Sequence, residues 1–143
     1  MNIDDVKNTV VIGAGEVGHG IALGLSMAGY RVRLNSTTEA SLQKGMDSVI
    51  ADLDRLVDLG FVEPNRAQAA LPRISTTTSL EEASQDADIV FEAVPENLEL
   101  KQKIFKDLDG FCPERTILTS SASSIIPSRF AQVTRRPDRV LVA

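Results

Sequence analysis

The chain has 143 residues, of which 43% are hydrophobic and 24% are charged, and its formal net charge is −5. That length and balance fit one globular domain and exclude a fibre, a coiled coil or a disordered tail. The acidic excess argues against a nucleic-acid surface built on bulk positive charge, and we expect no nucleic-acid partner. A single cysteine excludes an intramolecular disulfide, and a single histidine leaves little for a metal centre, so we expect no metal.

The sequence shows no targeting or membrane-spanning segment. Its opening residues, MNIDDVKN, are too polar for a signal peptide. No apolar run approaches the ~20 residues that a membrane-spanning helix needs. We therefore expect a soluble, cytoplasmic protein with no membrane partner.

Short β-rich runs alternate with longer helical patterns, which predicts a parallel sheet covered by helices. In the first half of the chain we expect strands over residues 8–13, 30–34 and 73–75, and helices over 16–28, 39–59 and 65–71. The helix over 39–59 has the clearest pattern, because its apolar residues recur every three or four positions. Gly29 and Gly60 each follow a predicted helix, where glycine is the usual terminating residue.

The second half of the chain continues the same alternation. The run ADIVFEAV over 87–94 is the strongest strand, followed by a helix over 96–111, a strand over 116–119, a short helix after Pro127 and a strand over 140–142. Ser79 with Glu82 three residues later predicts a capping box. Glu99 and Lys103 predict a favourable pair on the exposed helix face. We interpret residues 1–143 as one domain, an α/β doubly wound, mostly parallel Rossmann-type sheet with helices on both faces.

The turn after the first strand reads GAGEVG, a G-x-G-x-x-G pattern between a predicted strand and a predicted helix. Gly13 permits the tight turn, Gly15 lets the backbone approach a pyrophosphate, and Gly18 lets the helix lie close to the strand. Free N–H groups at the start of the helix, together with the helix dipole, then favour a phosphate. The pattern predicts a dinucleotide site, although a glycine-rich turn without a ligand remains an alternative.

The end of the second strand carries the residues that select the ribose in such a domain. NAD sites place an acid there, but the run LNSTT contains none before Glu39. Uncharged hydroxyls tolerate the 2′-phosphate of NADP. An NADP site normally also supplies an arginine, but Arg31 and Arg33 lie within the strand and not after it. Thr37 or Thr38 also suits the capping of the following helix, and the two roles are compatible.

A third group of residues lies at the end of the strongest strand, in the segment EAVPENLELK. In an open parallel sheet, ligands bind at the carboxyl ends of the strands, where the strand order reverses. Glu92 within an apolar strand and Glu96 at a helix start therefore suggest a role in a site. For Glu96, a favourable interaction with the helix N-terminus is an equal alternative.

The glycine turn, the segment EAVPENLELKQKIF and the segment ILTSSASSIIPSRF together resemble the NAD-binding domain of the L-3-hydroxyacyl-CoA dehydrogenase family. Within that family, the serine-rich run is most similar to the lambda-crystallin (L-gulonate 3-dehydrogenase) and carnitine dehydrogenase branch. The resemblance covers residues 10–143. It implies hydride transfer to NAD, with this domain holding the cofactor and a helical C-terminal domain supplying the dimer interface.

The resemblance also implies roles for individual residues. For the pyrophosphate, it implies Gly13, Gly15 and Gly18 together with the backbone of Glu16 and Val17. For the rest of the cofactor, the resemblance implies that Glu96 and Lys101 lie alongside the bound molecule. It also implies that Ala93 and Val94 line the cofactor site.

Three serines complete the residues that the resemblance implies. Ser121 matches the family position near the nicotinamide. Ser123 matches the serine that contacts the substrate, and it is our one candidate catalytic residue. The ribose-binding aspartate of the family falls on Ser36, which leaves NADP open beside NAD. A loop whose hydroxyls satisfy its own backbone is the alternative for the serine run.

The family's catalytic histidine would follow Ala143, and the C-terminal domain would follow it. His19 lies beside the glycine turn and does not replace that base, so we expect the chain alone to be inactive. The implied substrate is a hydroxy acid, a hydroxyacyl-CoA or a carnitine-like molecule, and a homodimer is expected only with the C-terminal domain. A stand-alone or designed dinucleotide-binding module and a structural crystallin-like protein remain alternatives.

Overall fold

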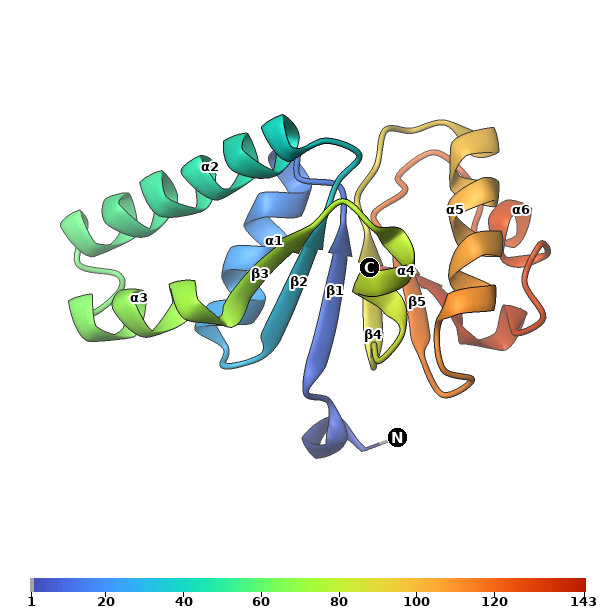
Figure 1. The fold of residues 1–143 in the computed structure, drawn as a ribbon, viewed down its shortest axis with the longest axis horizontal. Coiled ribbons are helices and arrows are strands. Elements are labelled where there is room, and N and C mark those ends of the chain that lie inside the picture. Colours follow the sequence, from blue (N-terminus) through green and yellow to red (C-terminus); the bar gives the residue numbers. More distant parts are fainter. Residues whose placement is uncertain (1) are drawn as a thin grey trace.

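The computed structural model describes residues 2–143 and places a six-stranded, all-parallel sheet at the centre of the molecule (Figure 1). The strand order is β3-β2-β1-β4-β5-β6. The strands are β1 (Asn8–Ile12), β2 (Arg31–Asn35), β3 (Ile74–Thr77), β4 (Ile89–Glu92), β5 (Ile117–Ser120) and β6 (Val140–Val142). This order is that of a doubly wound dinucleotide fold, which confirms the predicted fold class.

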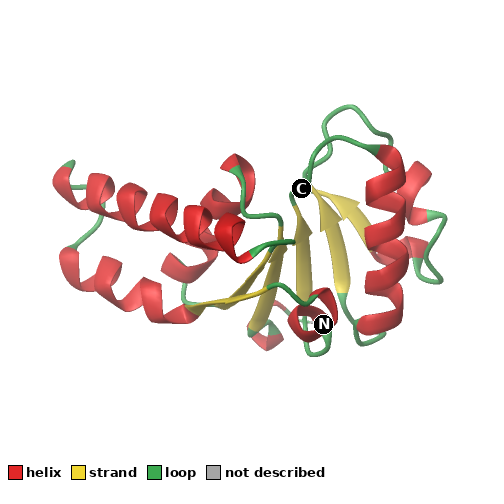
Figure 2. Ribbon diagram, turned by 45° about the horizontal axis from the view of Figure 1, so that its top comes forward, coloured by secondary structure: helices red, strands yellow, loops and turns green. Residues whose placement is uncertain are grey.

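Helices cover both faces of the sheet (Figure 2). One face carries α1 (Glu16–Met27) and α2 (Glu39–Asp58), with α3 (Pro64–Ala70) packed beside them. The other face carries α4 (Leu80–Ser84), α5 (Leu98–Phe111) and α6 (Ser128–Ala131). Within the described residues, three single 3-10 turns accompany these helices: η1 (Ile3–Asp5), η2 (Leu71–Arg73) and η3 (Pro137–Arg139).

Each face of the sheet has its own core, because neighbouring residues of a strand point to opposite sides. On β1, Val11 packs with Ala22 and Leu42 under α1 and α2. Val10 packs instead with Phe105 and Phe130, whose ring centroids lie 4.7 Å apart under α5 and α6. All of these side chains are buried, so the central strand is apolar on both sides, as parallel sheets require.

Some sequence-based expectations about local structure were wrong. The fourth strand is shorter than 87–94, because Ala93 and Val94 already lie in the loop after β4. The fifth helix begins at Leu98 and not at Glu96, because Asn97 is its N-cap and accepts a hydrogen bond from the Leu100 N–H at 2.9 Å. The predicted Glu99–Lys103 pair is replaced by an ion pair in which Lys103 Nζ lies 3.2 Å from Asp107 Oδ2.

The predicted capping box at the start of α4 is only half formed. The Ser79 hydroxyl accepts the Glu82 N–H at 3.2 Å, as expected. The Glu82 carboxylate does not return to Ser79, because it accepts the Thr77 hydroxyl at 2.5 Å. Thr77 in turn accepts the Ser79 N–H at 3.1 Å, so a side chain of β3 occupies the place of the capping glutamate.

Residues 2–143 contain neither a membrane-spanning helix nor a cluster of metal-ligating side chains. None of the helices there combines the length and the hydropathy needed to span a membrane. The same residues hold no group of three or more histidine, cysteine, aspartate or glutamate side chains arranged for a metal ion.

Candidate functional site

The glycine turn connects β1 to α1 at the carboxyl edge of the sheet. Gly13 has φ of +104°, a backbone conformation that favours glycine, and its N–H donates to the Asn35 carbonyl at 2.8 Å. A Cβ atom on Gly13 would lie 2.6 Å from the carbonyl oxygen of Ala93. The turn after β1 is therefore in direct contact with the loop after β4, at the point where the strand order reverses.

The other two glycines of the turn have contrasting surroundings. A Cβ atom on Gly18 would lie 1.8 Å from the Gly13 carbonyl oxygen, so the close packing of α1 against the turn requires glycine there. A Cβ atom on Gly15 would meet nothing within 4 Å. Gly15, Glu16 and Val17 are exposed at the start of α1, where helix N–H groups have no partner within the helix. This open helix start suits a phosphate group.

The residues after β2 carry no acidic group before α2. Ser36 is half-buried directly after β2, and the neighbouring Asn35 side chain donates to the Thr77 carbonyl at 3.0 Å. The Thr38 hydroxyl accepts the Ser41 N–H at 3.1 Å, which confirms the predicted cap of α2.

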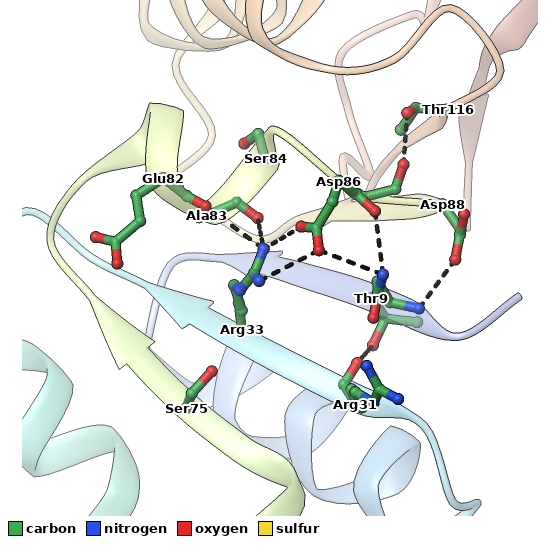
Figure 3. Close-up of polar contacts among 12 residues, drawn as sticks. Thr9, Arg31, Arg33, Ser75, Glu82, Ala83, Ser84, Asp86, Asp88 and Thr116 are labelled. Carbon is green, nitrogen blue, oxygen red and sulfur yellow. Dashed lines mark hydrogen bonds and ion pairs between the residues drawn. The ribbon is translucent and has the colours of Figure 1, made fainter.

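The arginines of β2 lie around a different hollow. Arg33 and Asp86 form an ion pair, with Arg33 Nη2 3.3 Å from Asp86 Oδ2 (Figure 3). Both residues, with Arg31, line a hollow of about 390 Å³ on the α4 face of β1 and β2. Arg33 is therefore engaged by a carboxylate and does not serve the residues after β2.

A buried ionic network joins β4, β5 and α5. The Lys101 ammonium donates to both carboxylate oxygens of Glu92 at 2.8 Å, and neither side chain is exposed to solvent. The Ser120 hydroxyl donates to Glu92 Oε2 at 2.5 Å. Glu92 and Lys101 could be predicted from the sequence, but Ser120 could not, because no motif distinguishes it from its serine neighbours.

Lys101 does not lie on the surface of the site. Its ammonium is fully buried, and it reaches Glu92 and, at 3.8 Å, a carboxylate oxygen of Glu96. The structure thus places Lys101 behind the loops that the resemblance assigns to the cofactor. Its direct contact with a cofactor stays a prediction.

Glu96 binds the serine-rich loop and not the start of its own helix. Its Oε1 accepts the N–H groups of Ser123, Ser124 and Ile125 at 3.2, 2.8 and 3.1 Å, and the Ser124 hydroxyl at 2.9 Å. The backbone and hydroxyl hydrogen bonds from Ser124 hold the pKa of the Glu96 carboxyl below its ordinary value. The suggested interaction with the helix N-terminus was therefore wrong, because Asn97 occupies that position.

The remaining predicted residues lie beside these loops. Ala93 and Val94 are half-buried, and the Ser121 N–H donates to the Glu92 carbonyl at 2.9 Å. Ser123 is exposed at the same edge. The structure therefore brings together the glycine turn, the loop after β4 and the serine-rich loop.

Comparison with known families matches residues 8–143 to the model described as "3-hydroxyacyl-CoA dehydrogenase, NAD binding domain". The chain belongs to this family. The geometry agrees with that assignment, since the glycine turn and the loops after β4 and β5 meet at the reversal of strand order, where doubly wound folds bind dinucleotides. The chain is accordingly an NAD-binding domain of the 3-hydroxyacyl-CoA dehydrogenase type, and NAD is its cofactor.

Relatives of this family domain are longer than the chain. A probable 3-hydroxybutyryl-CoA dehydrogenase of Bacillus subtilis is 38% identical over 137 residues, which are 96% of this chain and 47% of the relative. The peroxisomal multifunctional protein MFP2 of Arabidopsis thaliana is 34% identical over 96% of the chain and 19% of its own length. The chain thus spans about half or less of these relatives.

Solved structures of similar proteins have the same fold. FadB2 of Mycobacterium tuberculosis superposes with a TM-score of 0.92 at 33% identity, covering 96% of this chain and 48% of that one. (S)-3-hydroxybutyryl-CoA dehydrogenase PaaH1 of Ralstonia eutropha gives 0.91 at 36% identity, with 96% and 48% covered.

Proposed function

We propose that this chain is the cofactor-binding part of an enzyme that oxidises the secondary hydroxyl of a 3-hydroxyacyl-CoA. The observation that carries the proposal is the contact between Gly13 and the carbonyl of Ala93, which joins the phosphate turn to the loop after β4. The names of the Bacillus and Ralstonia relatives, both 3-hydroxybutyryl-CoA dehydrogenases, support the class of substrate.

The described residues fit a dinucleotide. The space over Gly15 is open, and the exposed N–H groups at the start of α1 would hold the pyrophosphate. Ser36 would lie at the adenosine ribose, since it occupies the position after β2. The bound cofactor supplies the hydride chemistry, and the protein supplies orientation.

At the other end of the cofactor, the serine-rich loop would meet the reacting groups. We propose that Ala93, Val94 and Ser121 line the nicotinamide and that the exposed Ser123 hydroxyl donates a hydrogen bond to the substrate oxygen. The single histidine is engaged elsewhere, because His19 Nδ1 lies 2.9 Å from the Gly15 carbonyl and Nε2 lies 3.1 Å from Asp52. We therefore expect the chain alone to bind cofactor without turnover.

The finer assignments are also proposals. The serine at position 121 supports the lambda-crystallin and carnitine dehydrogenase branch, with its hydroxy-acid or carnitine-like substrates. The relatives' names support the acyl-CoA substrate instead, and we favour it. A homodimer built by a C-terminal domain and a cytoplasmic location remain predictions.

The first test measures the melting temperature of the purified chain as NADH or NADPH is added. The second is an assay for oxidation of (S)-3-hydroxybutyryl-CoA by the same chain. A dinucleotide at 100 times its Kd should stabilise the fold by about 2.7 kcal/mol. Binding without turnover is the expected result. No stabilisation by either cofactor would contradict the proposal and favour a purely structural protein, while rapid turnover would contradict the expected inactivity.

A further inference from the structure

The buried pair of Glu92 and Lys101 is costly to maintain. Both side chains have no exposure, and removing two charges from water is compensated only when their geometry and hydrogen bonds are good. Apolar residues of similar volume often fill such positions with equal or better stability. The pair therefore needs an explanation beyond stability, and its contacts indicate one.

The Glu92 carboxylate contacts the backbone of one site loop directly and that of the other through the Ser120 hydroxyl. Its Oε1 accepts the Val94 N–H at 2.7 Å, in the loop after β4. Its Oε2 accepts the Ser120 hydroxyl at 2.5 Å, and the oxygen of that hydroxyl accepts the Ala122 N–H at 3.1 Å, in the loop after β5. One buried carboxylate thus links the two loops.

Lys101 fixes the carboxylate that makes these contacts. Because its ammonium binds both oxygens at 2.8 Å, it holds the plane of the Glu92 carboxylate relative to α5. Every buried side-chain nitrogen and oxygen has a hydrogen-bond partner over residues 2–143, so this network is fully satisfied. Such a network defines one arrangement of the loops and disfavours others.

The loops that Glu92 positions lie on one half of the dinucleotide site. In this fold the pyrophosphate lies at the turn after β1, and the adenosine ribose lies at the end of β2. The loops after β4 and β5 belong to the opposite half of the sheet, so they face the nicotinamide end. A displacement of these loops would therefore weaken the binding of the nicotinamide without changing the binding of the adenosine part.

We propose that Glu92 is a positioning residue for the nicotinamide end of the cofactor, acting through the Val94 N–H and the Ser120 hydroxyl with its carboxylate fixed by Lys101. The proposal rests on the proposed function, because it assumes a dinucleotide at the carboxyl edge. Its signature is selectivity: loss of the network weakens binding of a complete dinucleotide but not of ADP-ribose, which lacks the nicotinamide.

The sharpest variant is Ser120→Ala, which removes one hydroxyl and leaves the ion pair in place. We expect the Kd for NADH to rise about tenfold, because the loop after β5 loses its tie to Glu92 and must be ordered again when the nicotinamide binds. The Kd for ADP-ribose should change less than about twofold. Calorimetric titration of the chain with both ligands measures the two affinities.

Thr119→Val is the matched control. Thr119 precedes Ser120 on β5, and its buried hydroxyl donates to the Val90 carbonyl at 3.0 Å, outside the Glu92 network. This variant should leave the ratio of NADH to ADP-ribose affinity unchanged. A second test variant, Glu92→Gln combined with Lys101→Met, removes both charges while keeping similar volume, and it should lower the same ratio as Ser120→Ala does.

The outcomes separate the two proposals. If Ser120→Ala weakens the binding of NADH and of ADP-ribose equally, or changes neither affinity, the positioning role is wrong. If the unsubstituted chain binds neither ligand, the proposed function itself is wrong. If the charge-free double variant does not fold, the ligand ratio of Ser120→Ala alone decides the role of the network.

Discussion

The two halves of the carboxyl edge achieve their geometry by different means. Around the glycine turn, the backbone determines the site: Gly13 and Gly18 are required by close contacts, and no charged side chain is buried there. Around the loops after β4 and β5, side chains determine it, through Glu92 and Glu96. The first half should therefore respond to added volume, and the second to removed charge or hydroxyl groups.

The largest effect is expected from added volume at Gly18. In Gly18→Ala the new methyl group would lie 1.8 Å from the Gly13 carbonyl oxygen, so the turn or α1 must move. We expect the free energy of unfolding to fall by about 3 kcal/mol, measured by urea denaturation. Gly20→Ala is the control, because a Cβ there meets nothing within 4 Å. Equal stabilities of the two variants would contradict the close packing.

Gly15→Val should separate binding from folding. A Cβ at this position meets no protein atom, so the free energy of unfolding should change by about 1 kcal/mol or less. The valine side chain would occupy the space needed by a pyrophosphate, and NADH binding should be lost. An unchanged Kd for NADH would show that the turn is not the phosphate site.

A smaller effect, on the preference for NAD over NADP, is expected from Ser36→Asp. A carboxylate after β2 would accept both ribose hydroxyls of NAD and repel the 2′-phosphate of NADP. The Kd ratio of NADP to NAD should rise by about tenfold or more, as for one charge-assisted hydrogen bond. Thr37→Asp adds the same charge one residue later and should shift this ratio less. A ratio unchanged by Ser36→Asp would mean that Ser36 is not the selector.

The smallest effect concerns Glu96 and pH. Hydrogen bonds from Ser124 hold its pKa below its ordinary value of 4.5 in the folded chain. Its contribution to the serine-rich loop is therefore complete above about pH 4.5 and is lost as the pH falls through the lower folded-state pKa. The protection of the 123–125 amides against exchange, relative to an unstructured chain at the same pH, should fall over that acid range, as NMR can measure.

In Glu96→Gln the same amides should lose this pH dependence, and in the exposed neighbour Glu99→Gln they should retain it. Comparison of the two variants isolates Glu96 from Asp88 and Asp109. Burial of those two carboxyls raises the pKa, but hydrogen bonds to backbone N–H groups and arginines outweigh it and lower the pKa of each. A loss of protection in acid that persists in Glu96→Gln would contradict the role of Glu96.

Features that depend on residues close together in the chain could be predicted from the sequence. The fold class, the glycine turn and the cap at Thr38 follow from periodicity and from residues close together in the chain. The contact of Glu96 with residues 123–125 could not be predicted in this way, because it joins residues 27 to 29 positions apart. Ser120 was missed for the same reason, since its partner Glu92 lies on a neighbouring strand.

Amide chemical-shift changes, mapped as NADH is added to the chain, report directly whether the carboxyl edge of the sheet binds NAD. If NADH binds there, the changes should concentrate at Gly13 and Gly15–Gly18, in the loop of Ala93 and Val94, and in the loop of Ser121 and Ser123. Changes concentrated instead around the hollow lined by Arg31, Arg33 and Asp86, with the glycine turn unaffected, would contradict NAD binding at this edge.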